Sequence, residues 1–181
     1  MIKMFDMREF YITRILIKSL KPLELLYNHT ESREEDIMVR EAESCELNEL
    51  LELYLCLHED SLPEDNEHLR NTWSQIMNDP NHHLIVNVID GRIVSSCVCV
   101  IIPNLTRGVR PYAFVENVVT HEAYRGHGYA GECLDYAKQI SIRENCYKMM
   151  LLTGSKKPET LHFYENAGYY SSDKTAFIQW L

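Results

Sequence analysis

At 181 residues, the chain is long enough for one domain with a substantial hydrophobic core, or for one domain with an extension. Hydrophobic residues make up 45% and charged residues 25%, which is typical of a globular domain in water. The formal net charge is −9 and no dense run of lysine and arginine occurs, which argues against a nucleic-acid-binding protein and mildly favours cationic or neutral substrates. No stretch is long and apolar enough to predict a membrane span.

The cysteine and histidine patterns favour a cytoplasmic protein without a metal. None of the six cysteines forms a C-x-x-C pair, and most lie in apolar segments, which is typical of buried reduced thiols. The beginning of the sequence does not resemble a secretory leader, so we expect a cytoplasmic location. His82 and His83 have no suitably spaced cysteine or aspartate partners, so we expect no metal site and place both on the surface.

The first 36 residues are predicted to be an N-terminal extension of unknown role, because their pattern fits neither a strand nor a helix clearly. A domain is predicted over residues 37–181. It begins with a short strand over residues 37–40, followed by a helix that Ser44 would cap and by a second helix over residues 66–77.

A β-hairpin follows, because Asp90-Gly91 is a strong turn signal between two runs of β-forming residues. The further predicted elements, in chain order, are strands at 84–89, 92–102 and 112–120, a helix at 129–143, a strand at 147–153, a helix at 159–167 and closing strands at 169–170 and 175–181. This order predicts a mixed α/β (α+β) domain whose central, mostly antiparallel twisted sheet is flanked by helices.

A loop with two glycines, Gly126 and Gly128, joins the strand at 112–120 to the helix at 129–143. The first backbone N–H groups of a helix have no partner inside the helix and lie at the positive end of its dipole. Glycines let an anion approach those groups closely, so the sequence predicts a phosphate site here.

Two motifs and the element order from about residue 38 onward resemble the GNAT superfamily of acyl-CoA-dependent N-acetyltransferases. The first motif is Arg125-Gly126-His127-Gly128-Tyr129-Ala130, between strand and helix, and the second is L-H-F-Y-E-N-A-G-Y at residues 161–169. The resemblance implies a GNAT-type fold with a V-shaped opening for acetyl-CoA beside the strand at 112–120. The implied coenzyme-binding residues are Val118, Val119 and Thr120 for the pantetheine arm, and Arg125, Gly126, His127, Gly128, Tyr129, Ala130 and Gly131 around the diphosphate. For His127, the pattern leaves open whether the ring is a donor or is simply exposed.

Transfer of an acetyl group from a thioester to an amine requires a base for the amine and an acid for the departing thiolate. Glu116 is an acid in an otherwise apolar strand, so burial should raise the pKa of its carboxyl and suit it as the general base. The alternative is a half-exposed strand residue or a core ion pair. The resemblance implies that Tyr164, in the second motif, is the general acid; the alternative is an aromatic residue packed on the core.

The expected function is direct transfer of the acetyl group of acetyl-CoA to a primary amine of a small molecule or peptide in a ternary complex. The alternatives are a non-catalytic acyl-CoA-binding or regulatory module, and an ATP-binding protein, which the absence of G-x-x-x-x-G-K-[ST] disfavours. The sequence does not specify the acceptor, and it does not show whether the chain forms the homodimer that the resemblance makes plausible. The acidic residues Asp60, Glu64, Asp65 and Glu67 either attract an amine or form a solvated loop.

Overall fold

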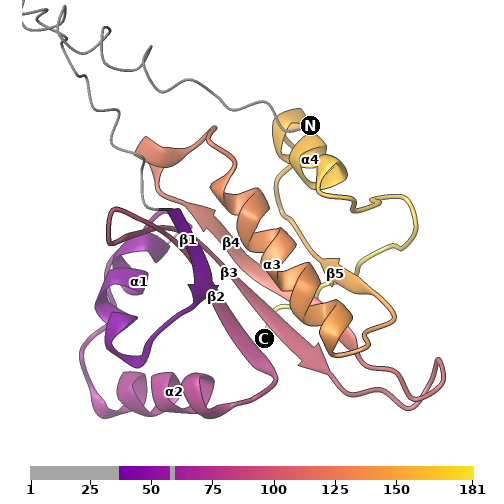
Figure 1. Cartoon of the computed structure of the whole chain (residues 1–181), viewed down its shortest axis with the longest axis horizontal. Helices are drawn as coiled ribbons and strands as arrows, with labels where there is room; N and C mark the ends of the chain where they lie inside the picture. Colours follow the sequence, from indigo (N-terminus) through magenta and orange to yellow (C-terminus); the bar gives the residue numbers. More distant parts are fainter. Residues whose placement is uncertain (1–36, 58–59) are drawn as a thin grey trace, which may run out of the picture. The chain divides into compact units, whose positions relative to one another are not determined.

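The computed structural model of the chain describes residues 37–57 and 60–181, so the predicted extension over residues 1–36 lies outside the described residues (Figure 1). Five strands form one sheet in the order β1-β2-β3-β4-β5. Their bounds are β1 Ile37–Glu41, β2 His82–Ile89, β3 Arg92–Ile102, β4 Tyr112–Thr120 and β5 Met149–Leu151. Neighbouring strands pair antiparallel except β4 and β5, which are parallel. The predicted mixed fold with a mostly antiparallel sheet is therefore confirmed.

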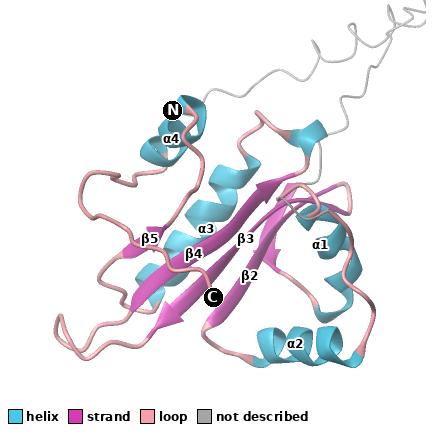
Figure 2. Cartoon of the chain, turned by 180° about the vertical axis from the view of Figure 1, so that it is seen from behind, coloured by secondary structure: helices cyan, strands magenta, loops and turns pink. Residues whose placement is uncertain are grey.

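Helices cover both faces of this sheet. They are α1 Leu47–Tyr54, α2 Glu67–Asn78, α3 Tyr129–Arg143 and α4 Pro158–Asn166, with 3-10 turns η1 Ser44–Glu46 and η2 Glu122–Tyr124. Helix α3 lies along the sheet in Figure 1 and behind it in Figure 2. Its bounds agree with the predicted helix at 129–143, because its apolar residues recur at helical spacing over the whole length.

The hydrophobic core has two layers, one on each side of the sheet. Alternate residues of β3 separate them: Cys97 and Cys99 pack toward α3, while Val98 and Val100 pack toward α1 and α2. This alternation is what a strand buried on both faces produces. Hydrophobic packing on both faces therefore stabilises the sheet, and β3, the neighbour of β4, is buried on both of its faces.

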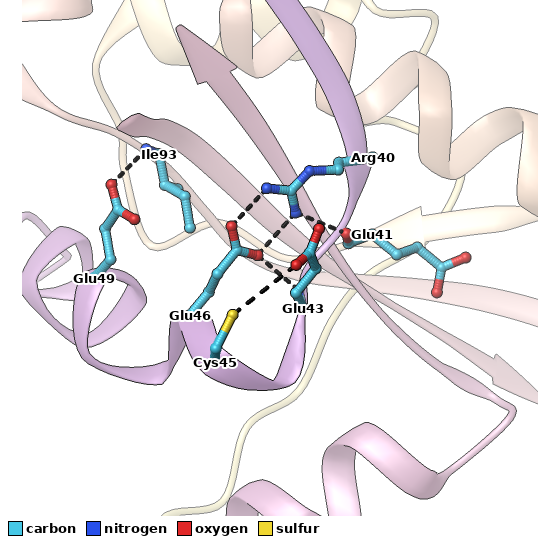
Figure 3. Close-up of polar contacts among 7 residues, drawn as sticks. All are labelled: Arg40, Glu41, Glu43, Cys45, Glu46, Glu49 and Ile93. Atoms are coloured by element: carbon cyan, nitrogen blue, oxygen red, sulfur yellow. Dashed lines mark hydrogen bonds and ion pairs between the residues drawn. The ribbon is translucent and has the colours of Figure 1, made fainter. Parts of the chain in front are cut away.

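The junction between β1 and α1 is held by charged groups (Figure 3). The guanidinium of Arg40 donates to both carboxylate oxygens of Glu46, at 2.5 and 2.8 Å, and this pairing lowers the pKa of Glu46. Glu43 and Glu46 also form a reciprocal capping box. The prediction that Ser44 caps the helix was therefore wrong, because the residue before it takes that position.

A second contact in Figure 3 ties α1 to the β2–β3 hairpin. Glu49 accepts a hydrogen bond of 2.7 Å from the backbone N–H of Ile93, at the beginning of β3. The hairpin turns at Asp90 and Gly91, both with positive φ (49° and 77°), as the predicted turn requires. The first turn of α1 is thereby fixed to the sheet.

The closing strands predicted at 169–170 and 175–181 do not form. Residues 167–181 have no helix or strand, and Phe177 and Trp180 are 92% and 89% exposed. The apolar residues there favour β structure, but β propensity reflects packing on a neighbouring strand. No described strand pairs with this segment, so the predicted strands are absent.

Candidate active site

Strand β4 is paired on both sides only over its first half. Ala113, Phe114 and Val115 are in register with β5, and no described strand pairs with residues 116–120 on that side. Because β5 ends at Leu151, the two parallel strands part after Val115. The backbone edge of residues 116–120 is left available for an added extended chain.

A β-bulge lies at the same point of β4. Ser96 and Val98 of β3 lie opposite Val119 and Glu116 respectively, so β4 has one residue more than β3 over this stretch. The extra residue reverses the alternation of the strand: Val115 packs on the α3 side, whereas Val119 packs on the α1 side. Glu116 is the last residue before this reversal.

Glu116 is half-buried, and burial raises the pKa of its carboxyl above the usual range. The backbone N–H of Asn117, which hydrogen-bonds the carboxylate, acts in the opposite direction. Within residues 37–57 and 60–181 Glu116 forms no ion pair, which counts against the core ion pair considered above. Asn117 itself has φ 52°, a left-handed conformation that non-glycine residues seldom adopt.

Tyr54, at the end of α1, is a neighbour of the bulge that the sequence did not identify. Burial raises the pKa of Tyr54 to about 12, and the nearby side chains of Ser96 and Asn117 act in the opposite direction. In the sequence, Tyr54 lies among leucines, and this tyrosine is the only signal that could have identified it. The structure adds a protonated hydroxyl to the region of Glu116.

Tyr164 comes from α4, with ring contacts to Phe163 (centroids 4.9 Å apart) and Tyr169 (6.2 Å). Burial raises the pKa of Tyr164, and the nearby Cys97 and Glu116 side chains raise it further. The structure thus brings the two predicted catalytic side chains within electrostatic range of each other. Tyr164 also lines a cavity of about 360 Å³ between β5, α4 and the C-terminal segment.

The glycine loop has the geometry of an anion site. Gly126 and Gly128 have φ values of 83° and 94°, and Gly128 is the N-cap of α3. A Cβ atom on either glycine would meet no atom within 4 Å, so the space in front of the loop is open. The N–H of Glu132 bonds to the carbonyl of Gly128 at 3.1 Å. The residues before Glu132 direct their N–H groups toward the beginning of the helix.

Side chains hold the loop in this shape. His127 Nδ1 donates to the carbonyl of Arg125 at 3.0 Å, and its ring stacks on Tyr129 with centroids 5.7 Å apart. Arg125 Nε donates to the carbonyl of Thr120 at 3.2 Å, which ties the loop to the end of β4. His127 is exposed, and its ring hydrogen-bonds to the backbone of the loop itself.

The remaining predicted coenzyme residues lie on the two sides of this loop. Thr120 Oγ1 lies 2.9 Å from Ser95 Oγ, and Ser95 Oγ donates to the carbonyl of Val119 at 2.7 Å. Val118 is half-buried on the α3 side. Ala130 and Gly131 are half-buried in the first turn of α3. All ten predicted positions therefore fall on one continuous segment from β4 to α3.

Two other groups of predicted residues lie elsewhere. Asp60, Glu64 and Glu67 are exposed between α1 and α2, as is Asp65, which pairs with a neighbouring arginine. The surface position predicted for His83 was wrong: it is 8% exposed, with Nδ1 3.1 Å from a carboxylate oxygen of β1. Across residues 37–57 and 60–181, no group of three or more His, Cys, Asp or Glu could hold a metal ion.

Two further predictions concern the cysteine thiols and membrane-spanning helices. All six cysteines are free, and three of them, Cys97, Cys99 and Cys133, are buried. Burial raises the pKa of Cys99 to about 11, which makes it unreactive at neutral pH. Among the described helices, none has both the length and the apolar composition needed to cross a bilayer.

The acetyltransferase (GNAT) family is matched over residues 47–169, which is more than half of the chain and includes both motifs. The chain belongs to this family. The resemblance inferred from the two motifs is thereby confirmed.

Individual relatives agree with this assignment. A solved structure from Agrobacterium tumefaciens, described as an acetyltransferase, is 37% identical with a TM-score of 0.73, over 79% of this GNAT chain and 99% of that chain. A Trypanosoma brucei acetyltransferase structure is 27% identical with a TM-score of 0.69, over 80% and 100%. The glucosamine 6-phosphate N-acetyltransferase of Trypanosoma brucei brucei is 36% identical over 84 residues, 46% of this chain. The match spans 55% of that curated relative.

Proposed function

We propose that this GNAT-family chain transfers the acetyl group of acetyl-CoA directly to a primary amine of a small molecule or peptide, with both substrates bound at once. The observation that carries the proposal is the second half of β4. There a strand edge that no described strand pairs with, a half-buried carboxylate and the open glycine loop follow one another within residues 116–128. These are the parts that an acyl-CoA-dependent transfer requires, in the order in which a bound coenzyme would need them.

The coenzyme supplies the acetyl thioester. The edge of residues 118–120 would pair with the amides of the pantetheine arm as an added strand. The N–H groups of residues 126–131 would hold the diphosphate, since Gly126 and Gly128 leave open space in front of them. Arg125 would keep the loop at the end of β4 through its bond to Thr120.

Glu116 accepts the proton of the attacking amine, directly or through one water molecule. Its raised pKa keeps its basicity closer to that of a working base at neutral pH. As the new C–N bond forms and the C–S bond breaks, a backbone N–H near Val118 or Val119 stabilises the carbonyl oxygen. Tyr164 donates its proton to the departing thiolate, and both side chains then exchange protons with solvent. The buried hydroxyl of Tyr164 has a raised pKa and is protonated at neutral pH, as this step requires.

The proposal does not specify which amine accepts the acetyl group. The curated relative from Trypanosoma brucei brucei is named for glucosamine 6-phosphate, so that amino sugar is the first acceptor to test. Because the match spans only 55% of that protein, polyamines, aminoglycosides and peptide N-termini belong in the same panel.

The test has two stages. First, thermal shift and calorimetry compare CoA with ATP; we expect CoA to bind and stabilise the chain and ATP to do neither. Second, release of free CoA thiol is followed with acetyl-CoA and each amine, and the acetylated product is identified by mass spectrometry. Turnover on at least one amine supports the transferase. CoA binding without turnover on any amine would favour the non-catalytic acyl-CoA-binding module, and binding of ATP alone would refute both.

A further inference from the structure

Asn87 of β2 is a buried amide that connects the sheet to the first turn of α3. Its side chain is 0% exposed. Its Nδ2 donates to Glu132 Oε2 at 2.6 Å and lies 3.5 Å from the carbonyl oxygen of Tyr129. The contact with Glu132 is therefore the strong one, and it joins residues 45 positions apart in the sequence.

Packing alone does not account for an asparagine at this position. Its neighbours on the same face of β2, Ile85 and Ile89, are buried and apolar. Asn87 Oδ1 is buried and has no hydrogen-bond partner among the described residues. A buried carbonyl oxygen without a partner opposes folding, so an aliphatic residue would suit the core better. The amide group is oriented by what its nitrogen donates to.

Glu132 lies in the first turn of α3, where the helix dipole attracts anions. Its backbone N–H bonds to Gly128, which places its carboxylate close to the N–H groups proposed to hold the coenzyme diphosphate. A free carboxylate at this position would compete for the same positive end of the helix. The bond to Asn87 instead directs the carboxylate toward β2.

We infer that Asn87 is a positioning residue that restrains the Glu132 carboxylate against the sheet and so leaves the N-terminus of α3 free for the diphosphate of the coenzyme. The inference rests on the proposed function, since it assumes that the diphosphate binds there. Unlike a packing role, this positioning role predicts that replacing Asn87 weakens CoA binding only when residue 132 carries a charge.

The experiment measures the dissociation constant of CoA by calorimetry at low ionic strength, using the full chain. Asn87→Leu should weaken binding roughly threefold to tenfold, the size of a charge–dipole contribution at a helix end. Glu132→Gln should bind at least as tightly as wild type. The double variant Asn87→Leu/Glu132→Gln should match Glu132→Gln, because an untethered amide does not compete for the anion site. Pantetheine, which lacks the diphosphate, should bind all four proteins equally.

Glu132→Asp guards against a folding defect in Asn87→Leu. It keeps the charge at an exposed position but shortens the side chain by one methylene, so it should lose the 2.6 Å contact and weaken CoA binding without altering the core. Unchanged affinity in Glu132→Asp would overturn the inference. The inference would also be overturned if Asn87→Leu weakened CoA binding equally in wild type and in the Glu132→Gln variant. Inorganic diphosphate is titrated in parallel: failure of wild type to bind CoA overturns the proposed function, whereas equal diphosphate binding by wild type and Glu132→Asp overturns the inference.

Discussion

The two halves of β4 differ in their pairing and in their proposed role, although they are consecutive in one strand. Residues 112–115 pair with β3, residues 113–115 also pair with β5 on the other side, and Ala113 and Val115 are fully buried. Among the described strands, β3 alone pairs with residues 116–120, which contain the bulge and include the positive φ of Asn117. Where the backbone is fully paired, the strand contributes stability. Where pairing stops, its peptide groups and one carboxylate remain available for chemistry.

Within β4, the residues that stabilise the fold end at Val115, and the residues proposed for catalysis begin at Glu116. Changes in the first half should alter the free energy of unfolding and leave the rate of folded protein unchanged. Changes in the side chains of Glu116 and Tyr164 should alter the rate and leave stability nearly unchanged, whereas a change at Asn117 of the bulge should have a smaller effect, on stability. The following substitutions test that division.

The largest effect is expected for Glu116→Gln, which removes the base and keeps the shape. The value of kcat should fall roughly thousandfold, within the range of general base catalysis. In wild type, burial raises the pKa of Glu116 above its usual value. The value of kcat/KM should therefore be at its full level at pH above the raised pKa of Glu116, and it should fall as the pH drops through that pKa. Glu116→Gln should lack this acid limb in a profile of kcat/KM against pH.

The matched control is Glu52→Gln, which neutralises an exposed glutamate of α1. It should retain the wild-type rate and profile. A Glu116→Gln enzyme with full activity would show that the second half of β4 does not supply the base.

Tyr164→Phe should lower kcat by roughly a hundredfold, because the thiolate must then leave without a positioned proton donor. The affinity for CoA should change little, since the ring remains packed against Phe163 and Tyr169. Steady-state kinetics and calorimetry measure the two quantities. Tyr170→Phe, at a position that is 85% exposed, is the control; equal losses in both variants would contradict the role of Tyr164.

Val115→Ala should lower the free energy of unfolding by about 2 kcal/mol, from lost apolar burial and the cavity left behind. The kcat of the folded protein should stay at the wild-type value. Urea unfolding gives the first quantity and steady-state kinetics the second. Leu105→Ala, at a position that is 89% exposed in the loop before β4, should be neutral within about 0.5 kcal/mol. A lowered kcat in stable Val115→Ala protein would remove the division between the halves.

The smallest effect is expected at the bulge. Asn117 has φ 52°, where alanine is less tolerated than asparagine, so Asn117→Ala should cost about 1 kcal/mol of stability. Asn117→Gly adopts this conformation without a steric penalty and should stay within about 0.5 kcal/mol of wild type. Thermal unfolding compares the two. If alanine proved as stable as glycine, the positive φ would carry no energetic cost.

The sequence predicted elements whose signals are local. The bounds of α3 follow from its apolar spacing, and the β2–β3 turn follows from Asp90 and Gly91. It failed where the outcome depends on distant partners: the apolar residues between positions 175 and 181 favour a strand, but no described strand pairs with them. His83 was predicted at the surface because the sequence does not show that Glu41 lies beside it.

The candidate site divides in the same way. The glycine loop and Glu116 could be predicted because they are contiguous and chemically distinctive. The contribution of Tyr54 could not be predicted, because Tyr54 lies on α1 and comes close to the bulge of β4 only in the folded chain. Nor could the Asn87–Glu132 contact, whose partners are joined only by the packing of β2 against α3. The bulge itself gives no sequence signal beyond an asparagine that tolerates a left-handed conformation.

The additional residue in β4 also constrains how this chain can change in length. Deleting residue 117 would remove the bulge and restore an unbroken pleat, with Glu116 and Val119 still opposite Val98 and Ser96 of β3. The valine that now packs toward α1 would keep its layer, and the loop after it would keep its direction. The first half of the strand has no extra residue to lose, so a deletion there would shift the pairing with β3 and turn side chains to the opposite layer. A single-codon deletion should therefore harm the fold far less at the bulge than in the first half of β4.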